Sequence, residues 1–267
     1  MSSIITLQTA PLTPVEKIKN TSDGKTYFVY NVSTEFSNWS QKNSKYEYKY
    51  KNYVTNWASF CNVHMMAMGL IYTGTYDKYK AEIDSIFPEL SRFPDKLAKF
   101  ILEDKDIREY YKKRFPTTSK DFFDGKKDAY GPNEIHNVLS WATNKFLNIG
   151  VVTYFSTNVP WKDIVNEIVY KNCPVGISGN FSGLHHIVLA VGCAYKSLSG
   201  GSVPGVTQVP DYIIVDDPFG KTYEYSKGLS GNDVWIPFKN CVSDLKPLDN
   251  ANFKYAHRFI KPKHLGY

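Results

Sequence analysis

The sequence contains no run of about 18 uninterrupted apolar residues, so we expect no membrane-spanning helix. Its first residues, MSSIITLQTAPLTPVEK, have no basic segment followed by an apolar block. We therefore expect no secretion signal and a chain that is made in the cytoplasm. The chain holds only 4 cysteines, and none of them forms a C-x-x-C pair. A protein of this size needs no disulfides to fold, so we expect reduced thiols, one of which could be reactive.

Internal repeats, an arginine-rich helix and the aromatic signature of nucleic-acid binders are also lacking. The 267 residues are 42% hydrophobic, which is enough for one large domain or two small ones. The net charge of +6 comes from lysines that are spread along the chain. Such a charge gives solubility and weak attraction to polyanions, and we do not expect nucleic acid as a partner. Binding that weakens steeply with salt and survives thiol alkylation would instead indicate nucleic-acid binding.

The chain is expected to consist of a short extension and one main domain. Residues 1–35 are the expected N-terminal extension, because they carry little periodicity apart from the strand-like TYFVYNV at 26–32. Within it, residues 1–25 are expected to form a loosely packed arm. Residues 36–267 are the expected main domain. Its first part, at 40–56, is polar and rich in Tyr and Lys, which indicates an exposed loop or an extended strand.

Helices are predicted in the first part of the main domain. The first begins after Ser59, which can cap it, and ends before Gly74. Its residues at helical spacing are Cys61, Met65, Met68 and Tyr72. Further helices are predicted at about 77–87, 95–114, 133–147 and 161–171.

Strands are predicted in the last part of the chain, where short β-branched runs end in Gly, Pro or Asp. The predicted strands are 174–179, 185–195, 211–218 and 222–225, with two more in DVWIPF (233–238) and ANFKYAHRFIK (251–261). Helices that come first and antiparallel strands that follow indicate the α+β class rather than alternating βαβ units.

Three chemically reactive side chains fall at the ends of these elements. Cys61 opens the first helix, His186 opens an apolar strand, and Asp217 closes the next strand. A helix N-terminus stabilises a thiolate, and an imidazole in reach can take its proton and pass it on. A carboxylate on the other ring nitrogen fixes the imidazole. We therefore expect these residues to meet where the helix abuts the sheet and to form an activated thiol.

The runs CNVHMMAMGL, LHHIVLAVGC and IIVDDPFG, in this order, resemble the C39-like peptidases of the papain-like superfamily. In that family a cysteine opens a helix, a His-apolar-strand-Gly segment follows far downstream, and an Asp-Pro-aromatic-Gly segment comes next. The resemblance covers roughly residues 36–225. It implies a papain-like fold, in which an N-terminal helix that bears the cysteine packs on an antiparallel sheet.

Matched residue by residue, the resemblance implies that Cys61 is the nucleophile, His186 the general base and Asp217 the orienting carboxylate. His186 is preferred to His185 because its distance from the closing glycine of the strand matches the family. Asp217 is preferred to Asp216 because it directly precedes a proline. A shift by one residue on a strand would turn the side chain to the other face.

The amide that stabilises the oxyanion in this family has no unique match in the chain. Asn56, which precedes the cysteine, is our first choice, and Gln41 in WSQKN is the alternative. The chain also departs from the family at His64, where many relatives carry Thr or a small residue. A further departure is the long loop between the histidine and aspartate strands.

Two other kinds of site stay open at this point. Cys61 and His64 are spaced to share one helical face and could bind zinc together with one of the paired histidines and one of the paired aspartates. Paired histidines on a strand alternate faces, so only one of them could point at the metal. A papain-like fold could also have lost its activity and kept its groove, as a binding module of a virion or cell-wall protein.

The resemblance implies a cysteine peptidase that hydrolyses amide bonds through an acyl-thioester and needs no cofactor and no metal. Two substrates are expected equally: a leader or precursor protein, and a stem or cross-bridge peptide of peptidoglycan. The composition, rich in Lys, Asn and Tyr, the basic charge and the missing signal suit a phage-encoded lytic enzyme. Such an enzyme would be associated with the virion or released to the cell wall.

Overall fold

The fold is taken from a computed structural model of the chain. The residues that the structure describes are 16–20, 23–32, 41–50, 53–55, 60–114, 132–181, 184–198, 204–205, 207–220, 231–241 and 252–262. The strand predicted at 222–225 and the predicted cap Ser59 lie outside these residues.

The strands are β1 (Glu16–Lys19), β2 (Thr26–Asn31), β3 (Tyr48–Tyr50), β4 (Tyr53–Thr55), β5 (Thr153–Pro160), β6 (Val175–Phe181), β7 (Leu184–Tyr195), β8 (Tyr212–Asp216), β9 (Val234–Pro237) and β10 (Asn252–Phe259). The α-helices are α1 (Cys61–Tyr72), α2 (Thr75–Lys78), α3 (Lys80–Ser85), α4 (Phe93–Glu103), α5 (Lys105–Arg114), α7 (Pro132–Leu147), α8 (Trp161–Val165) and α9 (Phe238–Cys241). A short 3-10 helix, η1 (Gln41–Asn43), and a π-helical turn, η3 (Asn166–Tyr170), complete the described elements.

Eight of the described strands form one antiparallel sheet. Its path is β1-β2-β7-β6-β10-β5, and β8 pairs with the free edge of β7 and carries β9. β7 is the central strand, because β6 pairs with its first part, β2 with its last part and β8 with its other edge. The remaining two strands, β3 and β4, form a separate hairpin. An antiparallel sheet with several helices confirms the predicted α+β class.

The segment predicted as an N-terminal extension contributes two strands to this sheet. β2 pairs with β7, and β1 pairs with β2. Tyr27, Val29 and Tyr30 of β2 are buried in the core. The strand predicted at 26–32 is therefore confirmed. Residues 16–19, which were predicted to belong to a loose arm, are instead hydrogen-bonded at the edge of the sheet.

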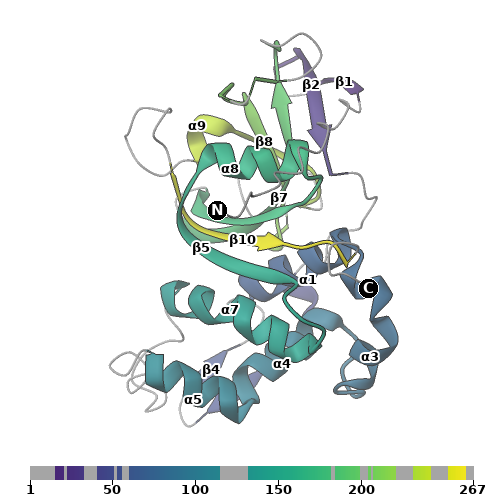
Figure 1. Ribbon diagram of the computed structural model, residues 1–267, viewed down its shortest axis with the longest axis vertical. Coiled ribbons are helices and arrows are strands. Elements are labelled where there is room, and N and C mark those ends of the chain that lie inside the picture. Colours follow the sequence, from purple (N-terminus) through teal and green to yellow (C-terminus); the bar gives the residue numbers. More distant parts are fainter. Residues whose placement is uncertain are drawn as a thin grey trace, which may run out of the picture.

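Helix α1 lies at the centre of the molecule, between the sheet and the helices α4, α5 and α7 (Figure 1). Every residue of α1 after Cys61 is buried, so the predicted apolar stripe does not mark a single buried face. Two glycines let this helix approach the sheet closely. A Cβ on Gly69 of α1 would overlap the ring of Phe259 in β10, and a Cβ on Gly176 of β6 would overlap Met65 of α1. The distance between α1 and the sheet is therefore fixed by packing.

The predicted helices are present, but three of them are divided, and the one at 161–171 corresponds to α8 and the π-helical turn η3. The prediction at 133–147 is confirmed by α7, and the one at 77–87 corresponds to α2 and α3. The helix predicted over 95–114 is interrupted at Asp104, whose backbone is extended. The Asp104 carboxylate accepts a hydrogen bond of 2.9 Å from the N–H of Ile107, and this contact caps the start of α5. None of the described helices is long and apolar enough to cross a membrane.

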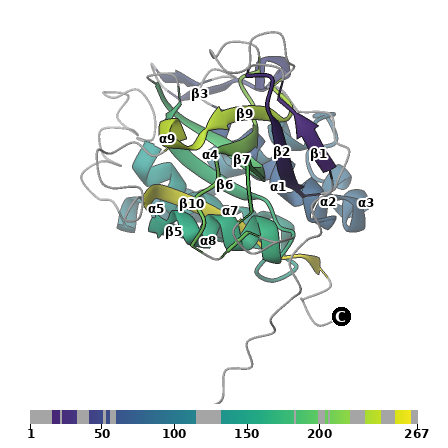
Figure 2. The same ribbon diagram turned by 90° about the horizontal axis from the view of Figure 1, so that it is seen from above.

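The strands β6, β7, β8, β9 and β10 confirm five of the predicted strands. The strand β5 was missed, because its sequence TYFSTNVP carries few apolar residues and its side chains are mostly exposed or half-buried. It lies at the edge of the sheet and ends in Pro160, a residue that edge strands tolerate. Figure 2, which views the molecule from above, shows β5 and β10 next to each other.

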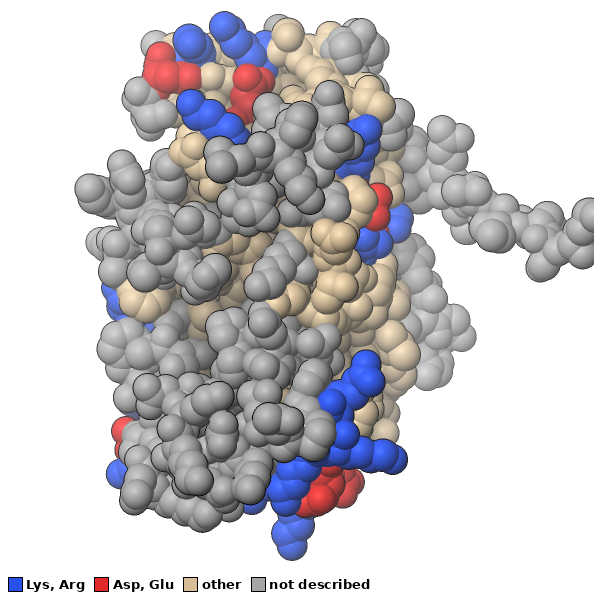
Figure 3. Space-filling model, turned by 90° about the vertical axis from the view of Figure 1, so that its left-hand side faces the viewer, with Lys and Arg blue, Asp and Glu red and all other residues tan. Residues whose placement is uncertain are grey.

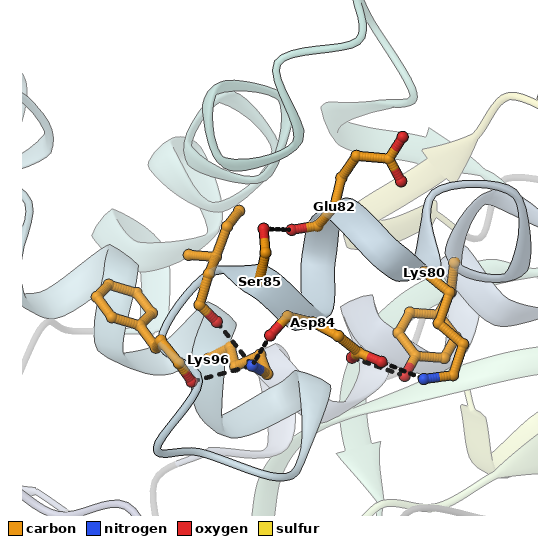
Figure 4. A network of polar contacts seen from close by, with 8 residues as sticks. Lys80, Glu82, Asp84, Ser85 and Lys96 are labelled. Atoms are coloured by element: carbon orange, nitrogen blue, oxygen red, sulfur yellow. Dashed lines mark hydrogen bonds and ion pairs between the residues drawn. The ribbon is translucent and has the colours of Figure 1, made fainter.

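A buried ammonium group holds the turn between α3 and α4. Lys96 is only 2% exposed. Its Nζ donates hydrogen bonds to the carbonyl oxygens of Asp84, Ile86 and Phe87 at 2.9, 2.7 and 2.9 Å (Figure 4). Carbonyl groups at the end of a helix lack hydrogen-bond donors within the helix, and the Lys96 ammonium group supplies these donors. Lys80 forms an ion pair with the Asp84 side chain in the same network.

Charges of both signs are mixed on the face shown in Figure 3. Basic and acidic side chains lie together at its lower end, where α5 is found in Figure 1. In this helix Lys112 pairs with Glu109 at 2.7 Å. Lys145 of α7 pairs with Asp104 and Asp106 at 2.7 and 2.9 Å. The described charges of this region are therefore partly neutralised by neighbours, as expected for a surface whose charge serves solubility.

Candidate active site

Cys61 is the first residue of α1, as predicted from the sequence. The residue at the N-cap position is Phe60, and no described side chain caps the helix, whereas the sequence had suggested Ser59. Within α1 the N–H of Val63 donates to Oδ1 of Asn62 at 2.8 Å, and the positive end of the helix dipole lies beside the sulfur. Such a position stabilises the thiolate form of a cysteine.

The other cysteines differ from Cys61 in their surroundings. All four are free of disulfides, but Cys173, Cys193 and Cys241 are buried and Cys61 is partly exposed. Burial raises the pKa of the Cys193 and Cys241 thiols, which keeps both protonated. The prediction that these three cysteines are core residues is confirmed, and Cys61 is the one that a substrate could reach.

His186 lies near the start of β7 and is hydrogen-bonded to Asp217, directly after β8. Its Nε2–H donates to Oδ1 of Asp217 at 2.8 Å. Both residues are buried, with exposed fractions of 6% and 3%. The Cys61 side chain lies near enough to His186 to raise the pKa of the imidazole. Since Asp217 occupies Nε2, the nitrogen that remains for the sulfur is Nδ1.

The pKa of His186 reflects both of these contacts. Burial by itself lowers the pKa of an imidazole, but the hydrogen bonds to Asp217 and to Cys61 outweigh it and raise the pKa of His186 to about 9. The imidazolium form is therefore favoured at neutral pH. An imidazolium beside a sulfur at a helix N-terminus is the arrangement that supports a thiolate nucleophile.

The turn after β8 fixes the Asp217 carboxylate. The N–H of Asp217 donates to the carbonyl of Gly231 at 2.7 Å, and the N–H of Phe219 donates to Oδ1 of Asp217 at 2.8 Å. The turn closes with a hydrogen bond of 3.0 Å from the N–H of Gly220 to the carbonyl of Asp217. Gly220 has a φ of 72°, a conformation that favours glycine. The sequence Asp-Pro-Phe-Gly is thus the turn that aims the carboxylate at the imidazole.

An aromatic ring from this turn packs beside the imidazole. The rings of Phe219 and His186 meet edge to face, with their centroids 6.1 Å apart. The Lys42 ammonium lies 5.0 Å from the centroid of the Phe219 ring, which places η1 next to the site. No sequence pattern pointed to Lys42, whereas Phe219 is the aromatic residue of the DDPFG motif.

The segment that contains η1 is tied to α4 through a buried carboxylate. Asp95 of α4 accepts hydrogen bonds from the Ser44 hydroxyl and from the N–H of Lys45, the second at 3.2 Å. The backbone of Gln41, one of the two predicted oxyanion residues, lies in η1, but its side chain is outside the described residues. Asn56, the preferred one, lies wholly outside them.

Asp216 and His185, the sequence neighbours of Asp217 and His186, were the alternatives for the same two roles. Asp216 is fully buried and accepts a hydrogen bond of 2.7 Å from the Tyr72 hydroxyl. Burial raises the pKa of Asp216 to about 7. Of the two adjacent aspartates, Asp217 is thus the one hydrogen-bonded to His186. The side chain of His185 lies outside the described residues. The sequence analysis did not foresee the contact between Tyr72 and Asp216.

No family model, curated protein or solved structure matches this chain.

The zinc alternative required His64, which the structure places in the core. Its Nδ1–H donates to the carbonyl of Phe60 at 2.9 Å, and the ring is fully buried. Burial lowers the pKa of His64 to about 3, so this imidazole is neutral. Within the described ranges, no three His, Cys, Asp or Glu side chains are grouped closely enough to hold a metal ion.

The contact with Cys61 predicts a measurable change at His186. In the Cys61→Ala variant, the pKa of His186 should fall from about 9 towards its ordinary value, because one of the interactions that raise it is removed. NMR titration of the imidazole Cε1–H resonances measures this pKa directly. The neutral His64, whose pKa is about 3, serves as a reference that should not titrate between about pH 5 and 10.

The same shift should appear in the stability of the protein. A histidine with a raised pKa stabilises the fold below its unfolded pKa, and this contribution is lost as the pH rises from about 6.5 to about 9. The wild type should therefore lose more stability over this range than the Cys61→Ala variant. An unchanged His186 titration in the variant would contradict the contact.

Proposed function

We propose that the chain is a cysteine peptidase with a papain-like, C39-like fold. The observation that carries the proposal is that Asp217 accepts a hydrogen bond from His186, whose imidazole interacts with the side chain of Cys61. A thiol at a helix N-terminus, an imidazole and an orienting carboxylate are the parts of a thiol hydrolase. The central position of α1 between a helical layer and an antiparallel sheet supports the same assignment.

In the first half of the reaction, the Cys61 sulfur bonds to the carbonyl carbon of the substrate, and the carbonyl electrons move to its oxygen. When this tetrahedral intermediate collapses, the C–N bond breaks and the Nδ1–H of His186 protonates the leaving amine. An acyl-thioester on Cys61 results. Throughout this half, Asp217 accepts the Nε2–H and keeps the ring in place.

In the second half, water adds to the thioester carbon while Nδ1 of His186 takes its proton. The C–S bond then breaks, which releases a carboxylic acid and restores the thiolate and imidazolium pair. The backbone N–H of Cys61 and the side-chain amide of Asn56 or Gln41 are proposed to stabilise the oxyanion in both halves. No metal and no organic cofactor takes part in the proposed steps.

Two peptide substrates fit the proposal. The first is a stem or cross-bridge peptide of bacterial peptidoglycan, and the second is a leader or precursor protein. Basic charge and a composition rich in Lys, Asn and Tyr support a phage-associated enzyme that acts on the cell wall. Zymography against several bacterial cell walls, beside digestion of unfolded protein substrates, separates the two.

Labelling with iodoacetamide tests whether Cys61 is the reactive thiol. We expect the label on Cys61, because its thiol is partly exposed and interacts with the imidazole of His186. The buried cysteines Cys173, Cys193 and Cys241 serve as internal controls and should stay unlabelled in the folded protein. Mass mapping of the labelled peptides gives the result.

Either of two results would count against the peptidase. One is a Cys61 that reacts no faster than a free thiol at the same pH. The other is a reactive Cys61 in a protein that cleaves neither cell walls nor proteins, and this second result would favour a binding module that has kept its groove.

A further inference from the structure

A buried hydrogen bond joins the far end of α1 to the residue beside Asp217. The Tyr72 hydroxyl donates to Oδ2 of Asp216 at 2.7 Å. Tyr72 is the last residue of α1, and Asp216 is the last residue of β8. We propose that Tyr72 and Asp216 are positioning residues, which hold the helix that carries Cys61 in register with the turn that carries Asp217. This inference rests on the proposed function of the site.

Both ends of α1 are thus linked through side-chain contacts to the dipeptide Asp216–Asp217. At its start, Cys61 contacts His186, which donates to Asp217. At its end, Tyr72 donates to Asp216. Twelve residues of α-helix separate these ends by about 16 Å. A shift of α1 along its axis would therefore strain both contacts together.

Asp216 is held from a second direction. Its Oδ1 accepts a hydrogen bond of 3.0 Å from the N–H of Asp233, so each carboxylate oxygen has a donor. The adjacent Asp217 N–H donates to Gly231 at 2.7 Å. The segment 231–233 thus fixes the dipeptide on one side, and α1 fixes it on the other.

A carboxyl group in this position is costly, which argues that its hydrogen bonds matter. Burial of a polar group without hydrogen-bond partners destabilises a fold, so a buried carboxyl group depends on its donors. Burial raises the pKa of Asp216 by more than the hydrogen bonds from Tyr72 and Asp233 lower it, so that the pKa is about 7. Burial also raises the pKa of Tyr72, so its hydroxyl keeps the proton that it donates. Directional bonds of this kind select one arrangement of the two elements.

Packing alone does not supply this restraint. The glycine contacts of Gly69 and Gly176 set how close α1 lies to the sheet, but apolar contacts are non-directional. The bond from Tyr72 restrains the position along the helix axis. A misplacement of about 1 Å between a nucleophile and its base can cost about a hundredfold in rate, so such a restraint is valuable.

The Tyr72→Phe variant tests the inference, because it removes one hydroxyl and keeps the ring. The readouts are the pH profile of Cys61 alkylation by iodoacetamide, and kcat and KM for amide hydrolysis. We expect alkylation near pH 6.5 to slow by about tenfold and kcat to fall similarly with KM unchanged, because the nucleophile and its base are misaligned.

The matched control is Tyr76→Phe. Tyr76 of α2 also donates its hydroxyl to an aspartate, Asp84, at 3.5 Å, but it is not part of the site. This variant should alkylate like the wild type. Asp216→Asn keeps an oxygen acceptor and a polar amide at the same position, so it should lose less than Tyr72→Phe. All rates are measured well below the melting temperature of each variant.

A Tyr72→Phe variant with the alkylation rate and pH profile of the wild type would overturn the inference. A loss in Asp216→Asn greater than that in Tyr72→Phe would assign the effect to the charge of Asp216 and would also overturn it. Failure of the proposed function looks different. In that case the wild type hydrolyses no amide bond, while the alkylation rates still report whether Tyr72 positions Cys61.

Discussion

The Cys61→Ala variant should lose all measurable amide hydrolysis and keep its fold. Removal of the nucleophile from a comparable hydrolase triad costs about six orders of magnitude in kcat, which leaves only background. The fold should persist because Cys61 is partly exposed and its side chain is small. The rate of release of new amino groups from peptidoglycan or protein substrate measures the activity, and circular dichroism measures the fold.

The control for this variant is another cysteine of the same chain. Cys173→Ala changes a buried thiol for which no catalytic role is proposed, so it should hydrolyse substrate like the wild type at temperatures where it is folded. Cys61→Ser offers a stricter comparison, since it keeps the shape of the side chain and replaces sulfur by a poorer nucleophile. Activity retained in Cys61→Ala would reject the mechanism.

The Asp217→Ala variant should lose activity by about 10²- to 10⁴-fold, because the imidazole loses the acceptor that fixes its orientation and tautomer. Asp217→Asn should lose much less. An asparagine can keep Oδ1 as the acceptor for both His186 Nε2–H and the N–H of Phe219, the two hydrogen bonds that the structure assigns to this oxygen. Measurement of kcat and KM for Asp217→Ala and Asp217→Asn shows directly which variant loses more activity.

Equal losses in the two Asp217 variants would show that the charge, and not the orientation, is what the carboxylate contributes. A negligible loss in Asp217→Ala would move the orienting role to another residue. Asp163→Ala is a suitable control, since Asp163 is half exposed, pairs with Arg258 at 3.0 Å, and has no part in the proposed site. Its activity should match that of the wild type.

The sequence predicted the three site residues that lie beside short patterns typical of a helix start, a strand or a turn. Cys61 opens a helix whose end is signalled by Gly74, and Asp217 precedes a proline at the end of a strand. His186 lies in a β-branched apolar run that ends in glycine, a pattern typical of a buried strand. Each position follows from short-range patterns, so the structure could be expected to place these residues at the ends of neighbouring elements.

The parts that the sequence did not predict depend on contacts between distant residues. Tyr72 and Asp216 are 144 positions apart, and neither carries a pattern that points to the other. The proximity of η1 to the site follows from the contact of Lys42 with Phe219, which is equally remote in sequence. The edge strand β5 was missed because it has little apolar content to reveal it.

The place of β10 between β6 and β5 has a consequence for the order in which the candidate site is assembled. β10 inserts between β6 and β5, and its Phe259 rests against Gly69 of the helix that carries Cys61. The ribosome makes this strand after every residue of the candidate site. Until it emerges, the packing beneath that helix lacks Phe259, although β6 and β7 also contact the helix. We therefore expect the candidate site to reach its final packing only once β10 has joined the sheet.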